Sequence, residues 1–399
     1  MHKLTAAALL FPSVAWAQSG APVPTGAPNV PEFKPAFAGQ TRAPAVKTTT
    51  PLQVTTIASG LRSPWGLAFL PDGRMLVTEK SPPSLRIVER DGKVSAPVAG
   101  LPQAADKGQG GLLDVAIAPD FAQSRLVYIT YAEPREGGSG TAVARGRLVD
   151  GQAPRLDQVE SVFRMQPTLD SDKHFGARLV FAPDGKLFVA LGERSDLPGR
   201  VQAQDLGSHF GKIVRVNRDG SVPADNPFVG RPGARPEIWS YGHRNIQGAA
   251  LDAQGRLWVA EMGPQGGDEV NRPERGRDYG WPTIIYGEEY SGRPIGRAQT
   301  QAPGMEQPVY YWDPVTAPSG MVFYSGDLVP EWRGNAFIGG LVAKALVRLV
   351  MDGDRVVGEE RLLTDLDARI RDVRQGPDGA LYVLTDARDG KLLRVAPAG

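Results

Sequence analysis

The 399-residue sequence contains four histidines, and one of them, His174, occupies a position suited to proton transfer. It lies in the sequence Lys-His-Phe-Gly-Ala-Arg, immediately before an apolar segment typical of a β-strand. A neutral imidazole accepts a proton near physiological pH, so His174 is a candidate general base. The same local sequence would suit a histidine that only packs in a turn, and the residues alone leave both interpretations open.

The densest polar segment, residues 241–248, contains three groups that could hold an anion, namely Arg244, Asn245 and Gln247. A guanidinium and two amides within four residues suit a carboxylate or a quinone oxygen. Oxygen donors follow in the chain, because a glycine-containing turn at Gly263 and Pro264 precedes Glu269. Backbone carbonyls and carboxylates are the ligands that Ca²⁺ prefers, although the spacing matches no EF-hand and a solvated polar loop remains the alternative.

Two further segments carry groups for a polar ligand. Gln109 lies in a glycine-rich loop, residues 107–111, which lacks the following helix of a phosphate-binding loop. Arg369 and Arg371 alternate at the period of a strand, so both guanidinium groups face one way. Two cations on one face suit a polyanionic ligand, and a solvated strand edge would show the same pattern.

These residues lie next to copies of one hairpin pattern, in which a turn of the Pro-Asp-Gly type joins two apolar strands. The copies are Gly66–Glu79, Arg178–Glu193, Ala249–Met262 and Val373–Asp386, with looser copies at Asp114–Tyr131 and Gly320–Gly340. Six copies predict an all-β fold, a six-bladed β-propeller of four-stranded antiparallel blades. A stack of β-sandwiches would not repeat one hairpin so regularly, and an α/β barrel would need helices that the sequence lacks. In a propeller, loops from all blades meet at one end of the central channel.

Composition excludes several classes of protein. Lys and Arg number 45 and Asp and Glu number 44, so the basic excess of a nucleic-acid-binding protein is missing. The chain has no cysteine, and therefore no disulfide, thiolate metal site or cysteine nucleophile.

The N-terminus predicts export to the periplasm or secretion. Residues 1–17 have the charge, apolar run and small residues of a signal peptide, and a buried N-terminal helix is the alternative. Residues 18–50 are rich in Pro, Ala and Thr without apolar periodicity, which predicts a linker before a propeller domain over residues 51–399. No later stretch is apolar enough to predict a transmembrane segment.

Taken together, these segments resemble the soluble sugar dehydrogenases that depend on pyrroloquinoline quinone (PQQ), in particular the aldose sugar dehydrogenase branch. The resemblance extends from about Leu52 to Val395. It rests on the motifs GQGGLLDVAIAPDF, HFGARLVFAPDG, YGHRNIQG, EMGPQGGDEVN, YGWP, APSGM and RIRDV, in this order. It implies PQQ- and calcium-dependent oxidation of aldose sugars at the anomeric carbon to lactones, with an electron acceptor that the sequence does not identify.

The resemblance also implies roles for individual residues. His174 would be the catalytic base, and the backbone carbonyls of Gly263 and Pro264 would bind the catalytic calcium. Glu269 and the backbone of Tyr279 would form a second, structural calcium site. The implied cofactor-binding residues are Gln109, Arg244, Asn245, Gln247, Tyr290, Lys344, Arg369 and Arg371.

Two positions depart from the family pattern. Val342 stands where relatives usually present a lysine, and Lys344 would share its face if this segment were a strand. Glu193 stands where an aspartate is common, and its longer side chain could still support His174. A calcium-dependent lactonase and a non-catalytic propeller that binds proteins or glycans are the competing functions.

Overall fold

The computed structural model describes residues 20–399, so the predicted signal peptide lies outside the described residues. Strands dominate, and no helix within residues 20–399 is long and apolar enough to cross a membrane. The helical segments described are single turns at α1 (Phe121–Ser124), α2 (Leu197–Arg200), Pro330–Trp332 and Thr364–Leu366.

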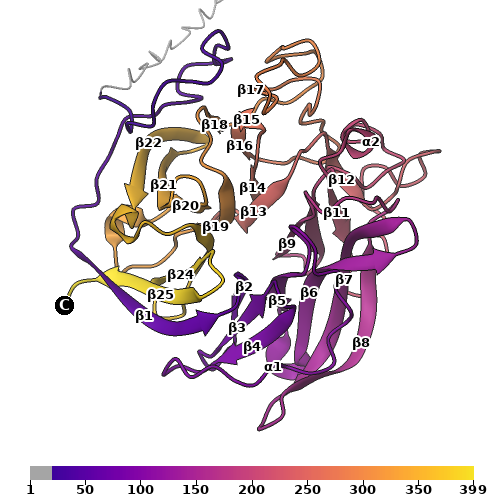
Figure 1. The fold of residues 1–399 in the computed structure, drawn as a ribbon, viewed down its shortest axis with the longest axis vertical. Coiled ribbons are helices and arrows are strands. Elements are labelled where there is room, and N and C mark those ends of the chain that lie inside the picture. The colour runs from indigo at the N-terminus through magenta and orange to yellow at the C-terminus, as the bar shows by residue number, and fades with distance from the viewer. Residues whose placement is uncertain (1–19) are drawn as a thin grey trace, which may run out of the picture.

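Six sheets stand as blades around a common axis, as Figure 1 shows. Blade I consists of β2 (Pro64–Phe69), β3 (Met75–Glu79) and β4 (Ser84–Val88), and blade II of β5 (Leu112–Ile117), β6 (Leu126–Arg135), β7 (Gly138–Val149) and β8 (Arg155–Arg164). Blade III consists of β9 (Gly176–Phe181), β10 (Leu187–Leu191), β11 (Lys212–Val216) and β12 (Ile238–Tyr241), and blade IV of β13 (Ile246–Leu251), β14 (Leu257–Glu261), β16 (Asp268–Asn271) and β18 (Tyr310–Trp312). Blade V consists of β19 (Pro318–Phe323), β20 (Ala336–Gly340), β21 (Ala345–Asp352) and β22 (Arg355–Leu362), and blade VI of β23 (Ile370–Gln375), β24 (Leu381–Thr385), β25 (Gly390–Pro397) and β1 (Leu52–Leu61). A small ladder of β15 (Gln265–Gly266) and β17 (Gly287–Glu288) extends blade IV.

The predicted six-bladed β-propeller is confirmed, with one difference in blade I. Its fourth position is taken by an irregular segment, in which Ser95 N donates to Ile87 O and Val98 N donates to Leu85 O, both at 2.8 Å. The neighbouring Ala99 then bridges to Arg155 of blade II. The outer edge of β4 is therefore covered without a regular strand, which limits pairing with another chain.

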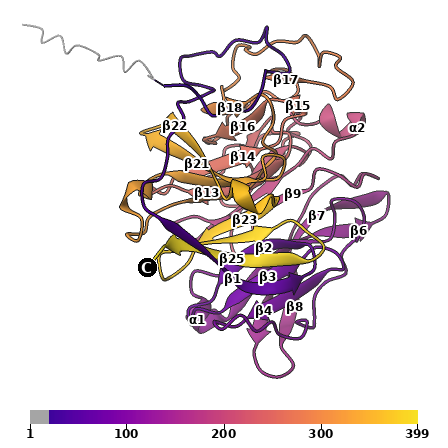
Figure 2. The ribbon, with the colours of Figure 1, turned by 60° about the vertical axis from the view of Figure 1, so that its left-hand side comes forward.

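The ring closes by pairing the two ends of the domain. Strand β1 runs antiparallel to β25, with Leu52 opposite Pro397 and Leu61 opposite Gly390. In Figures 1 and 2 the indigo β1 lies beside the yellow β25. Because β1 belongs to the last blade and β2 begins the first, this ladder links the two blades that would otherwise end the sheet series.

Four charges lie at the centre of the ring, of which Asp114, Arg178 and Asp372 are buried and Arg374 is partly exposed. The Nη1 atom of Arg178 lies 3.0 Å from Asp114 Oδ1 and 3.2 Å from Asp372 Oδ1. Arg374 Nη2 lies 3.4 Å from Asp114 and 3.5 Å from Asp372. Both carboxylates are fully buried, so the two arginines provide their compensating charge.

The same side chains bond to the backbone of the other blades. Arg178 Nε donates to Gln247 O at 2.6 Å, and Arg374 donates to Leu67 O at 3.1 Å and to Met321 O at 3.2 Å. The six innermost strands contact one another around the axis, and this charge network has a partner on each of them. The network therefore joins all six blades at one point.

Residues 20–50 pack on the propeller, unlike the linker that the composition predicts. Asn29 donates from its backbone and side-chain nitrogens to Asp313 Oδ1 at 2.9 and 2.8 Å, and Gln40 Nε2 donates to Pro308 O at 2.9 Å. Ala43 is fully buried among side chains of blades IV and V. The segment is held mainly by polar contacts to residues far along the chain, which apolar periodicity cannot indicate.

We expect the Arg178→Met variant to lose about 3–5 kcal/mol of unfolding free energy, because it leaves two buried carboxylates with only one arginine. Chemical denaturation with circular dichroism would measure the loss. The control is Arg155→Met, which removes a surface ion pair with Asp157 and should leave the midpoint nearly unchanged. Equal midpoints for the two variants would show that the central network does not hold the ring.

Candidate active site

A cavity of about 390 Å³ lies at one end of the channel and receives side chains from all six blades. Its walls are formed where inner strands begin and where second strands end, as the sequence repeat predicts. The lining residues are Trp65, Lys80, Gln109, Leu113, Phe175, Gly176, Asn245, Gln247, Met262, Tyr290, Ala317, Leu341, Val342, Arg369 and Arg371. Six of the eight predicted cofactor-binding residues are among them.

Trp65 links this cavity to the central charges. The indole is 3% exposed, and the Arg178 guanidinium lies 4.2 Å from its ring centroid. The Arg371 guanidinium lies 5.9 Å from the same ring. Cations over an indole face are attracted to it, so Trp65 presents a fixed aromatic surface to the cavity.

Cations and amides from blades IV and VI form one wall. Arg369 Nε lies 2.8 Å from Asp386 Oδ2, and Arg371 Nη2 lies 3.0 Å from Asp386 Oδ1. The amide Oε1 of Gln247 accepts from Arg371 Nη1 at 3.3 Å, and its Nε2 donates to Asn245 Oδ1 at the same distance. Both arginines share one carboxylate, so this wall keeps an excess positive charge for a ligand.

His174 lies beside the cavity, in contact with its glycine-rich loop. Its backbone nitrogen donates to Gln109 Oε1 at 2.8 Å, and the next residue, Phe175, lines the cavity. His174 itself is 6% exposed and is not one of the lining residues. Its backbone has a φ of +49°, in the left-handed region, so the loop turns sharply at this residue.

Glu193 fixes the orientation of the His174 ring. The Nδ1 atom lies 3.0 Å from Glu193 Oε2, which also accepts from Ser195 N. A carboxylate at Nδ1 favours the tautomer with its proton there, so the lone pair is on Nε2. Burial and then the Arg244 charge lower the pKa of His174, while Glu193 opposes them. The imidazole is therefore neutral near pH 7, in the form that accepts a proton.

Arg244 lies behind the cavity wall. Its Nη1 donates to Met262 O at 2.9 Å and to Gly263 O at 2.6 Å, and its Nε is buried without a hydrogen-bond partner among the described residues. Met262 lines the main cavity, so Arg244 contacts a lining residue without lining the cavity itself. The carbonyl of Gly263, a predicted calcium ligand, is thus occupied by a cation of the protein itself.

A second, ion-sized cavity of about 10 Å³ adjoins Arg244, and the predicted residues Gly263, Glu269 and Tyr279 line it. Burial and then the neighbouring Glu261 raise the pKa of Glu269 well above its ordinary value. Both carboxylates accept from Asn271 Nδ2, at 2.9 and 2.8 Å. Within residues 20–399 no three His, Cys, Asp or Glu side chains form a metal-binding group.

The position of Lys344 differs from the prediction. Residues 341–344 form a turn between β20 and β21, so the period of a strand does not apply to them. Lys344 does not line the cavity, and its Nζ lies 2.8 Å from Asp367 Oδ1. Val342 does line it and is 57% exposed, so blade V presents an apolar side chain there.

Comparison with known proteins gives the family. The family model described as "Glucose / Sorbosone dehydrogenase" matches residues 61–394. The chain belongs to this family. It is 47% identical to the aldose sugar dehydrogenase of Escherichia coli over 350 residues, which are 87% of this chain and 93% of that protein.

Solved structures of sugar dehydrogenases have the same fold. A crystal structure of glucose dehydrogenase aligns with a TM-score of 0.83 and 52% identity, over 87% of this chain and all of that one. The PQQ-bound form of an aldose sugar dehydrogenase from Streptomyces coelicolor aligns with a TM-score of 0.71 and 28% identity, over 88% of this chain and all of that one. These matches confirm the resemblance to soluble sugar dehydrogenases.

Trp65 and Lys80 are among the lining residues of this family member that were not predicted. Trp65 lies eight residues before the turn glycine of the first copy, as Gln247 and Arg371 do in the fourth and sixth copies. Lys80 directly follows the first hairpin copy and lies seven residues after its turn glycine, as Asp386 does in the sixth copy. Aligning the six copies would therefore have indicated both residues by position.

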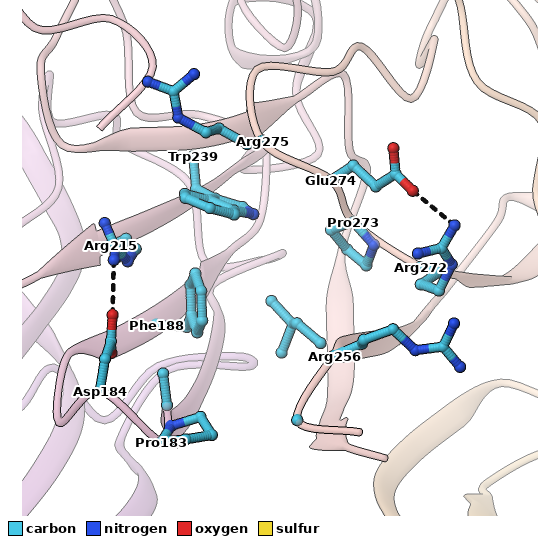
Figure 3. A pocket seen from close by; sticks show the side chains of 13 residues that line it. Pro183, Asp184, Phe188, Arg215, Trp239, Arg256, Arg272, Pro273, Glu274 and Arg275 are labelled. Carbon is cyan, nitrogen blue, oxygen red and sulfur yellow. Dashed lines mark hydrogen bonds and ion pairs between the residues drawn. The ribbon is translucent and has the colours of Figure 1, made fainter. Parts of the chain in front are cut away.

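A cavity of about 440 Å³ lies at the opposite end of β9 from His174, between blades III and IV (Figure 3). Phe188 and Trp239 form one wall, with ring centroids 5.4 Å apart. Arginines surround it, and two of them pair with lining carboxylates, in Arg215–Asp184 and Arg272–Glu274. None of the predicted site residues lies here, so the cavity at the His174 end is the candidate active site.

Nuclear magnetic resonance titration of the cofactor-free protein should give a His174 pKa below the ordinary value of about 6.5, because burial disfavours the imidazolium. In Glu193→Gln the pKa should fall further, since the carboxylate that favours the charged ring is gone. The His174→Gln spectrum identifies the resonance. An unchanged or higher pKa in Glu193→Gln would contradict the assigned ion pair.

Proposed function

We propose that this protein oxidises aldose sugars at the anomeric carbon to lactones, with PQQ and calcium as cofactors. The proposal rests on one observation. The neutral His174, held by the buried Glu193, lies beside a cavity that is lined by arginines and by Trp65. Bound PQQ would supply an ortho-quinone that accepts a hydride, and calcium would polarise a quinone oxygen. The PQQ-bound relative from Streptomyces coelicolor supports this choice of cofactor.

The chemistry of the cavity fits a planar polyanion. PQQ carries three carboxylates, which suit the guanidinium groups of Arg369 and Arg371. The Trp65 indole lines the cavity with a small exposed area, and the amides of Asn245 and Gln247 offer neutral hydrogen bonds. These five residues would hold the cofactor, with Gln109 between it and the loop of His174.

The small cavity fits a cation near Glu269. The raised pKa of Glu269 indicates that its negative charge lacks a neighbouring positive charge, which Ca²⁺ would provide. The backbone carbonyl of Tyr279 is the proposed second ligand. For the catalytic calcium, Gly263 and Pro264 remain the proposed ligands, and Arg244 would have to release Gly263 O to the ion.

His174 would perform the proton transfer. Its Nε2 lone pair accepts the proton of the anomeric hydroxyl as the anomeric carbon loses a hydride, so that the C–O bond becomes a carbonyl. The resulting imidazolium is stabilised by Glu193, whose carboxylate stays ionised. Holding Nδ1–H on the carboxylate keeps Nε2 in its accepting form throughout.

The sugar would enter past Tyr290, which lines the cavity and is 72% exposed. The neighbouring Glu289 pairs with Arg200 of α2 at 2.5 Å, which fixes the loop that carries the tyrosine. An exposed aromatic ring beside a cavity is suited to the apolar face of a pyranose. We further propose that residues 1–17 direct the chain to the periplasm or out of the cell and are removed.

The competing functions have less support. A lactonase would need free carboxylates at the channel centre, but Asp114 and Asp372 are paired there with Arg178 and Arg374. A non-catalytic propeller gives no reason for a buried His–Glu pair next to the cavity. Only the dehydrogenase accounts for the base, the cations and the aromatic floor together.

Reconstitution tests the proposal directly. Chelator-treated, cofactor-free protein should reduce an artificial dye with glucose only after both PQQ and Ca²⁺ are added. Calcium alone should raise the melting temperature, because an ion that binds only the native state stabilises it. Dye reduction without PQQ, or none with both additions across a panel of aldoses, would contradict the function.

His174→Gln should lower turnover by about a hundred- to ten-thousandfold, the usual effect of losing a general base. Glutamine keeps a polar side chain of similar size, so PQQ binding should persist and can be measured separately by absorbance. The matched control is His209→Gln, a second buried histidine, which pairs with Glu237 on the outer part of blade III. A His174→Gln enzyme that holds PQQ and keeps activity within tenfold of the parent would exclude His174 as the base.

A further inference from the structure

Lys80 places a further cation at the cavity. It directly follows β3 of blade I, and its side chain lines the cavity together with Trp65. Its backbone nitrogen donates to Ser63 O at 3.0 Å, which fixes the start of the side chain. The ammonium Nζ donates to Gly108 O at 2.9 Å, next to Gln109.

The ammonium has donors left for a ligand. A lysine carries three N–H donors, and Gly108 O is the single acceptor that the described residues provide to Nζ. Lys80 lies at the cavity but in no ion pair within 4.0 Å among residues 20–399, unlike Arg369 and Arg371, which share Asp386. Two N–H groups are therefore free to bind an acceptor that enters the cavity.

The surroundings of Lys80 favour an anion. Burial and then the Arg371 guanidinium lower its pKa, and Asp386 and Asp106 only partly offset them. Lys80, Arg369 and Arg371 together carry three positive charges at the lining, and the two arginines share the carboxylate of Asp386. A ligand with carboxylates would compensate the remainder.

The glycine-rich loop packs directly on this lysine. Gly111 has a φ of +123°, and a Cβ atom there would lie 2.1 Å from Lys80 O and 2.8 Å from its Cγ. Only glycine fits this approach, so the loop that carries Gln109 is shaped around Lys80. The stem of the Lys80 side chain is thereby held against the loop, and its ammonium reaches Gly108 O.

We propose that Lys80 is a cofactor-binding residue of this protein, whose ammonium binds a carboxylate of PQQ beside the arginines of blade VI. This inference rests on the proposed function. It gives blade I, which also contributes Trp65 to the cavity, a role in holding the cofactor.

The test is a PQQ titration of the cofactor-free full chain with calcium present, followed by absorbance without sugar. Lys80→Gln should raise the Kd for PQQ by about ten- to a hundredfold, the effect of losing one charge-assisted hydrogen bond. Lys80→Arg keeps the charge and should retain most of the affinity. Lys107→Gln, which removes an exposed lysine from the same loop, should leave the Kd unchanged.

A second ligand separates binding from an anchoring role. The trimethyl ester of PQQ lacks the carboxylate charges, so Lys80→Gln and the parent should bind it equally. Equal weakening for PQQ and its ester would mean that Lys80 only anchors the Gly108 loop, and this would overturn the inference. Equal PQQ affinity of parent and Lys80→Gln would also overturn it, whereas failure of the parent to bind PQQ would reject the proposed function itself. Melting temperatures of the cofactor-free variants confirm that each is folded.

Discussion

The structure depends on the charge network at its axis, where Arg178 and Arg374 lie between Asp114 and Asp372. Buried ion pairs often contribute little net stability, because desolvation offsets their attraction. Here, however, the planar guanidinium groups also donate to backbone carbonyls of neighbouring inner strands, so the network fixes how the blades meet. The inner strands must leave room for it: a Cβ at Gly320 would lie 1.8 Å from Asp372 Oδ1. The charges are therefore a geometric constraint as well as an energetic one.

The candidate active site is built on this constraint. Trp65 lies over Arg178, so the floor of the cavity is fixed by the network beneath it. Several of the remaining site residues occupy two equivalent positions in the blade repeat, just before the inner strand and just after the second strand. His174 and Asn245 take the first position, and Lys80 and Asp386 take the second. Residues far apart in sequence converge because each blade delivers its two loops to the same end of the channel.

Local sequence patterns predicted the parts of the molecule that local chemistry determines. The repeated turn identified all six blades, because a tight hairpin needs particular residues wherever it occurs. Arg369 and Arg371 were correctly expected to face one way, and both pair with Asp386. Lys344 was misplaced because its segment is a turn, where alternation along a strand has no meaning. Residues 20–50 were interpreted as a linker because their contacts, such as Asn29 with Asp313, join positions that no local pattern connects.

The charges around the candidate active-site cavity explain how one site can suit both a polyanion and a neutral base. A cavity with excess positive charge attracts carboxylates, and positive charge also disfavours a protonated histidine. Arg244 lowers the pKa of His174 in this way, in addition to the effect of burial. Glu193 partly offsets that shift, and its contact with Nδ1 orients the ring. The pKa of Glu193 itself is lowered by His174 and Arg244, although burial acts to raise it. The base therefore remains unprotonated at neutral pH because it is buried and lies among cations. The carboxylate beside it can still stabilise the proton that the base accepts.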